Sequence, residues 1–170
     1  VMDIKVGRGA FMKTEADARE LAKSIMRVGK LAGKKVSVLL TRMDAPLGRA
    51  IGNANETREA LEVLHGGGPD DLVECTFALG AEMLRRGGVA KNEADGRRQM
   101  KAAVDDGRAL ALMKKVIKKQ RGDERVVEDP SLLEVAKVAV RVPSPKDGYV
   151  SDIDAMELGL VGVALGAGRT

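Results

Sequence analysis

The chain has 170 residues, of which 44% are hydrophobic and 32% charged, and this composition is typical of a soluble globular protein and argues against a disordered one. Aromatic residues make up only 2%, which argues against stacking platforms for single-stranded nucleic acid. The net charge of +4 would suit phosphate-bearing partners, but a solvated surface with excess lysine is the favoured interpretation. A single cysteine excludes an internal disulfide. The sequence has no apolar run long enough to cross a membrane and no signal-peptide pattern. We therefore predict a cytoplasmic protein with no membrane or nucleic-acid partner.

The first forty residues are predicted to form a strand, a helix and a second strand. Residues 1–6 alternate apolar and polar, as a half-buried strand does. Thr14 is a predicted N-cap, with Asp17 three residues later, for a helix whose apolar residues recur at helical spacing up to Ala32. Residues 36–40 are apolar nearly throughout and indicate a buried strand. This order predicts a parallel sheet with a right-handed crossover.

The middle of the chain is predicted to be mainly helical. A helix is expected through residues 56–64, and Pro69 is expected to open the next one at the position where its missing N–H costs least. Residues 91–121 are also helical in pattern, but the apolar register changes near residues 105–107. The change of register predicts two helices there.

The last part of the chain is predicted to contain a hairpin and a helix. Residues 135–142 alternate as an edge strand does, residues 143–148 have a turn composition, and residues 149–153 match a partner strand. Asp154 is expected to cap a final helix that runs through Leu165. Because a strand pattern starts at the first residue and a glycine-rich turn lies at the end, both ends look cut.

The glycine-rich loop after the first strand matches a dinucleotide-binding turn only in part. Gly7 and Gly9 stand at the carboxyl end of a parallel strand, where ligands bind in open α/β sheets. The position of the third glycine holds Met12, and the helix begins too late for its N-terminus to meet a pyrophosphate. Two interpretations stay open: close approach of the backbone to a ligand, or a tight turn with positive φ.

Three other features have simple structural explanations. The only histidine, His65, ends a helix, where a cation complements the helix dipole. Cys75 lies in an apolar helical run and is interpreted as a small buried hydrophobic residue. Residues 114–121 place their lysines opposite an apolar pair, which favours a solvated helix face over a nucleic-acid patch.

Residues 46–53 are the most unusual stretch, because proline and glycines follow a strand and Glu59 comes next on the helix. Irregular backbone leaves carbonyl oxygens free, and carbonyls with one carboxylate suit a hard cation. The alternative is an ordinary strand-to-helix loop with Glu59 in solvent, and the chemistry alone favours that alternative.

Several segments taken together resemble the thymidine and pyrimidine nucleoside phosphorylase family. They follow one another along nearly the whole chain, which is more specific than any single motif. These segments are residues 3–14, 46–54, 58–60, 66–72, 147–150 and 165–169.

The resemblance implies an enzyme that cleaves thymidine or uridine with phosphate, giving the free base and a pentose 1-phosphate. It also implies an α/β fold, with a parallel or mixed sheet flanked by helices. Residues 1–130 would belong to the central glycosyltransferase-type domain, and residues 131–170 to the start of a C-terminal, β-containing subdomain. The whole enzyme would be a homodimer.

The resemblance carries over a few site residues and leaves out others. Phe11 matches an apolar residue beside the 5-position of the pyrimidine. The carbonyls of Leu47 and Ala50 and the carboxylate of Glu59 match part of a K+ site. The resemblance therefore favours a cation site at residues 46–59 over an ordinary strand-to-helix loop.

The family's Lys-His-Ser-type phosphate loop and its base-binding Arg, Ser and Lys match nothing in this chain. No catalytic residue is therefore assigned, and the isolated chain is expected to be inactive. The alternative function is a stand-alone binding or scaffold module on the same fold without catalysis.

Overall fold

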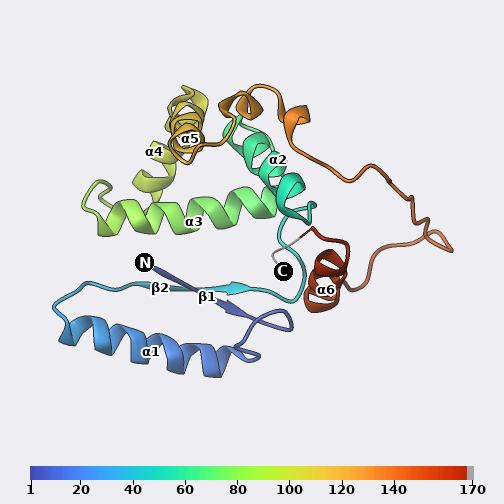
Figure 1. The fold of residues 1–170 in the computed structure, drawn as a ribbon. Helices are drawn as coiled ribbons and strands as arrows, with labels where there is room; N and C mark the ends of the chain where they lie inside the picture. The colour runs from blue at the N-terminus through green and yellow to red at the C-terminus, as the bar shows by residue number, and fades with distance from the viewer. Residues whose placement is uncertain (168–170) are drawn as a thin grey trace.

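A computed structural model describes residues 1–167 of the chain, and its first unit is a βαβ motif. Strand β1 (Met2–Val6) and strand β2 (Val38–Arg42) pair in parallel, with Met2 opposite Val38 and Val6 opposite Arg42. Helix α1 (Glu15–Leu31) connects them and lies along one side of the pair (Figure 1). The predicted strand, helix and parallel strand are confirmed, although β2 begins two residues later than residue 36.

Helix α1 begins where its sequence predicts. The side-chain oxygen of Thr14 accepts a hydrogen bond from the Asp17 backbone N–H at 3.2 Å, which satisfies one of the free donors of the first turn. The Thr14 hydroxyl in turn donates to the Asp17 carboxylate at 2.7 Å. The predicted cap at Thr14 is therefore confirmed.

Four helices form the second part of the fold. They are α2 (Asn53–Leu64), α3 (Asp70–Arg86), α4 (Glu93–Asp105) and α5 (Arg108–Lys119). Helix α2 starts three residues earlier than predicted, and Pro69 is the N-cap of α3 rather than its first helical residue. The predicted break between α4 and α5 is confirmed, because Gly107 there has a φ of +77°. Helix α3 runs along the side of the strands opposite α1 (Figure 1).

The buried core is small and lies beside α2. Two short 3₁₀ helices follow α5, η1 (Glu124–Val127) and η2 (Pro130–Leu132). Helix η1 folds back against α2 and α5, and η2 contacts η1. Leu61 and Val127 are the largest fully buried side chains, and Val126 packs with them. Burial of these side chains fixes the orientation of α2, the helix that carries Glu59.

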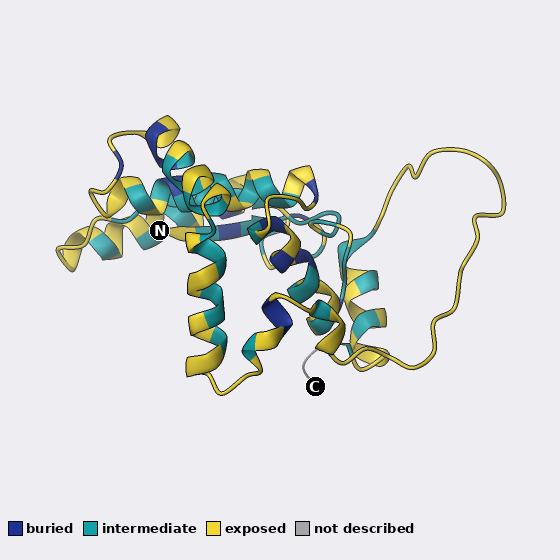
Figure 2. Cartoon of the chain, turned by 90° about the horizontal axis from the view of Figure 1, so that it is seen from above, coloured by how far each residue is buried: buried dark blue, intermediate teal, exposed yellow. Residues whose placement is uncertain are grey.

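The predicted hairpin is wrong. Residues 134–153 contain no strand and are exposed throughout, forming the long connection on the outside of the molecule in Figure 2. Val138, Val140 and Val142 are 77%, 79% and 87% exposed. The alternation of apolar and polar residues is present, but the described chain offers no packed partner, and an isolated two-stranded hairpin is only marginally stable in water.

Helix α6 (Ala155–Ala164) follows that connection, and the cap predicted at Asp154 is confirmed. One carboxylate oxygen of Asp154 accepts hydrogen bonds from the backbone N–H groups of Met156, at 2.9 Å, and of Glu157, at 3.1 Å. One side of α6 stays open, since Leu160 and Leu165 are exposed. None of the helices described here is long and apolar enough to cross a membrane.

The chain exposes far more surface than a compact protein of its size. Its accessible surface is 12709 Å², whereas a compact monomer of 18.1 kDa has about 8,100 Å². The excess comes from the connection between η2 and α6, from the open side of α6 and from the outer side of α1.

Candidate functional site

The largest cavity near the ends of the strands has a volume of about 840 Å³. It opens beyond the carboxyl end of β2, which is the edge where open α/β sheets bind ligands. Helix α3 contributes Leu72 and Cys75 to its wall, and α6 contributes Ala155 and Leu158. Three of the predicted site residues, Leu47, Ala50 and Glu59, also line it.

Glu59 lies at the inner side of the loop 46–52 and is buried. One oxygen of its carboxylate accepts the backbone N–H of Arg49 at 2.8 Å. Gly48 has a φ of +72°, and a Cβ at that position would overlap the carboxylate of Glu59. The Gly48 N–H donates to the Asp71 carboxylate at 3.1 Å, which anchors the loop to α3. The loop is thus folded around Glu59, so the alternative of an ordinary loop with Glu59 in solvent does not hold.

The donor set of this loop fits a hard cation. Within residues 1–167, the carbonyl oxygens of Leu47 and Ala50 accept no hydrogen bond, and Glu59 forms no ion pair. A buried carboxylate without a cationic partner is unfavourable, and carboxylate and backbone carbonyl oxygens are the ligands that hard cations take. In the same part of the chain, no group of three or more His, Cys, Asp or Glu side chains could hold a metal ion. The residues present therefore fit a hard cation with oxygen ligands, with Glu59 supplying a carboxylate.

A second cavity of about 500 Å³ lies at the same loop. Arg49 and Arg58 line it. Ala50, Ile51 and Glu59 line both cavities. The cavity does not change which residues could bind the ion.

Phe11 is not part of this arrangement. Its side chain is 98% exposed in the loop after β1, and it lines neither of the two cavities. The structure therefore brings Leu47, Ala50 and Glu59 together but leaves Phe11 apart from them. Contact between Phe11 and a pyrimidine stays a prediction.

The glycines before Phe11 are explained by packing. Gly7 has a φ of +128°, and a Cβ there would lie 2.9 Å from the backbone nitrogen of Asp44 and still closer to its side chain. Gly9 donates its N–H to the Met43 carbonyl at 2.9 Å and also has no room for a Cβ. Of the two interpretations left open, the tight turn with positive φ accounts for Gly7. Gly9 is explained by the close approach of Met43 and Ala155 and not by its φ. Close approach of this backbone to a ligand stays a hypothesis.

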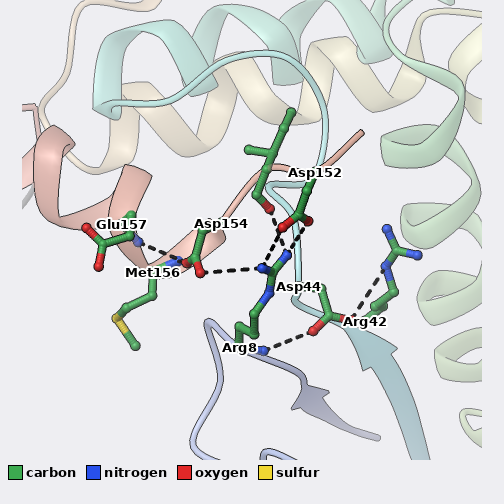
Figure 3. Close-up of polar contacts among 8 residues, drawn as sticks. Arg8, Arg42, Asp44, Asp152, Asp154, Met156 and Glu157 are labelled. Atoms are coloured by element: carbon green, nitrogen blue, oxygen red, sulfur yellow. Dashed lines mark hydrogen bonds and ion pairs between the residues drawn. The ribbon is translucent and has the colours of Figure 1, made fainter. Parts of the chain in front are cut away.

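Sequence analysis missed a cluster of charged residues around Arg8 (Figure 3). The Arg8 guanidinium donates two hydrogen bonds to the Asp152 carboxylate, at 2.8 and 2.5 Å, and lies 3.6 Å from the Asp154 carboxylate. The backbone N–H of Arg8 donates to the Asp44 carboxylate at 3.0 Å. The guanidinium of Arg8 lowers the pKa of Asp152 by hydrogen bonding to its charged form. No local pattern could have revealed the pair, because Arg8 and Asp152 are 144 residues apart.

The remaining candidates have structural roles. A ring nitrogen of His65 lies 2.8 Å from the Leu61 carbonyl at the end of α2. Cys75 is only half-buried and lines the larger cavity, so the prediction of a buried hydrophobic residue is only partly right. The lysine-rich helix is a solvated face, as expected, with Lys114 paired to Glu128 at 2.5 Å.

Comparison with known proteins finds relatives along the whole chain. A family model described as "Glycosyl transferase family, a/b domain" matches residues 1–110. The pyrimidine-nucleoside phosphorylase of Bacillus subtilis (strain 168) is 43% identical over 169 residues, which is 99% of this chain and 39% of the relative. Proteins of the same name from Staphylococcus aureus (strain bovine RF122) and Staphylococcus epidermidis (strain ATCC 12228) are 40% identical over the same coverage. The chain thus spans 39% of the length of these relatives.

Proposed function

Because the chain belongs to the glycosyl transferase family by its a/b domain, we propose that it forms part of a pyrimidine-nucleoside phosphorylase. Such an enzyme transfers the pentose of thymidine or uridine to phosphate and releases the free base. The observation that carries the proposal is the 43% identity to a protein of that name over 99% of the chain. A nucleoside and phosphate would be the substrates, and the working protein would be a cytoplasmic homodimer without nucleic-acid or membrane partners.

The role proposed for this segment is to hold K+ beside the substrates. The carbonyl oxygens of Leu47 and Ala50 and the carboxylate of Glu59 would be part of its ligand set, and the burial of Glu59 without an ionic partner within residues 1–167 supports this. A bound K+ would supply a fixed positive charge that draws neighbouring backbone oxygens together. Glu59 and the Arg49 N–H would keep the loop in the shape that binds it. Phe11 is proposed as an apolar wall for the pyrimidine.

The 170-residue chain by itself is proposed to be inactive. Phosphorolysis needs groups that bind phosphate and groups that stabilise the negative charge of the departing base. The only histidine, His65, bonds the Leu61 carbonyl, and the sequence around it is not a Lys-His-Ser loop. Release of thymine from thymidine by the purified chain, dependent on added phosphate, would contradict this.

A chimera tests the phosphorylase assignment directly. The segment of the Bacillus subtilis relative that matches this chain would be replaced by the chain, and base release from thymidine and uridine would be measured with and without phosphate. We expect phosphate-dependent release of base. A chimera that folds as a dimer but releases no base would favour the binding or scaffold module instead.

A further inference from the structure

The position of α6 depends on contacts at its two ends. It follows the connection of residues 134–153, all of which are exposed, so few contacts of that connection orient the helix. At the N-terminal end, Arg8 bonds the carboxylates described above, and the Ala155 N–H donates to the Asp44 carbonyl at 3.0 Å. Gly9 leaves the space that Ala155 occupies, since a Cβ at Gly9 would lie 3.0 Å from the Ala155 Cβ.

The other end of α6 rests on the candidate cation loop. The Ala167 carbonyl accepts the backbone N–H of Asn53, the first residue of α2, at 2.9 Å. A Cβ at Gly52 would lie 2.9 Å from the Ala167 Cβ, and a Cβ at Gly162 would contact Ile51 at 3.5 Å. Helix α6 therefore contacts the residues that directly follow Ala50.

We propose that Arg8 is a positioning residue that holds the N-terminal end of α6 in its place beside the loops after β1 and β2 (the seating of α6). Through α6, Arg8 would support the loop around Glu59. The bidentate pairing of Arg8 with Asp152 is the geometry in which a guanidinium both binds and orients a carboxylate. The pair is partly exposed, so its free energy alone is modest. The pair acts on the position of α6 because Asp152 lies three residues before Ala155, the first residue of the helix. The seating of α6 is independent of the cation, whereas the effect on the loop rests on the proposed function.

Cys75 reports the seating of α6. It is the only cysteine of the chain, and it lines the cavity that Ala155 and Leu158 of α6 also line. In the Arg8→Gln variant we expect alkylation of the Cys75 thiol to be about two- to fivefold faster than in the unmodified chain, since an exposed ion pair shifts an equilibrium by roughly this factor. Hydrogen exchange of the Ala155 amide should accelerate by a similar factor. If neither rate changes in Arg8→Gln, the proposal is wrong.

Two further variants separate a positioning role from a general loss of stability. Arg19→Gln removes the exposed ion pair between Arg19 and Glu15 in α1 and should leave both rates unchanged. Asp152→Asn should also accelerate both rates, and the double variant should be no faster than Arg8→Gln alone, because the two groups act as one unit. Effects of Arg8 and Asp152 that simply add would overturn the proposal.

The cation response distinguishes failure of this proposal from failure of the proposed function. Glu59→Gln should abolish stabilisation by K+. Arg8→Gln should retain stabilisation by K+ but need a higher K+ concentration for half of the effect. Absence of any K+ response in the unmodified chain would refute the cation site and the supporting role at the loop. Unchanged Cys75 and Ala155 rates in Arg8→Gln would refute the seating of α6.

Discussion

Replacement of Glu59 by glutamine tests the candidate cation site most directly. The side chain keeps its size and can still accept the Arg49 N–H, so the free energy of unfolding without K+ should change by only about 1 kcal/mol. The difference should appear when K+ is added. An ion present at ten times its dissociation constant stabilises the folded chain by about 1.4 kcal/mol, and the glutamine variant should lose that amount.

Thermal unfolding in KCl, compared with choline chloride at equal ionic strength, measures this effect. For a chain of this length, the ion should raise the melting temperature by about 3 to 6 °C, and Glu59→Gln should show no such rise. Glu62→Gln is the matched control, because Glu62 lies three residues further along the same helix and is exposed. A rise in the Glu59→Gln variant equal to that of the unmodified chain would refute the assignment of Glu59 as a ligand.

The remaining predictions concern the loop and the acid limit of stability. Gly48→Ala should lower the free energy of unfolding, measured in urea, by about 2 to 4 kcal/mol, because strain at a φ of +72° adds to overlap with Glu59. Gly33→Ala is the control: its φ is +68° with open space around it, so it should lower that free energy by only about 1 kcal/mol. Equal losses in the two variants would contradict the overlap. Hydrogen bonding by Arg85 lowers the pKa of Glu82 from 4.5 to about 2, so Glu82 contributes stability above pH 4.5 that is lost as the pH falls towards 2. Glu82→Gln should flatten the fall of unfolding free energy over that range, and an unchanged slope would show that Glu82 does not contribute.

Much of the helical part of the fold could be predicted from the sequence. The caps at Thr14 and Asp154, the break at Gly107 and the parallel βαβ order all depend on residues close together in the chain. A side-chain cap needs only the next two or three backbone N–H groups, and a φ above zero needs only a glycine. Such local requirements are visible in the residues themselves.

The hairpin failed because it needs a partner. Alternating valines at positions 138, 140 and 142 show which side chains are apolar, but not whether another strand or a core lies beside them. In the structure these valines face solvent, so the pattern has no packing to stabilise it.

The candidate site also combines features that the sequence predicts with features that only the structure shows. The sequence by itself, through its resemblance to a family, identified Leu47, Ala50 and Glu59 as residues to examine together. Only the tertiary structure decided that Glu59 is buried under Gly48, that Phe11 lies apart, and that Arg8 holds Asp152 across 144 positions of the chain. Burial and ion pairing between distant segments depend on how helices pack, and no local spacing in the chain records that.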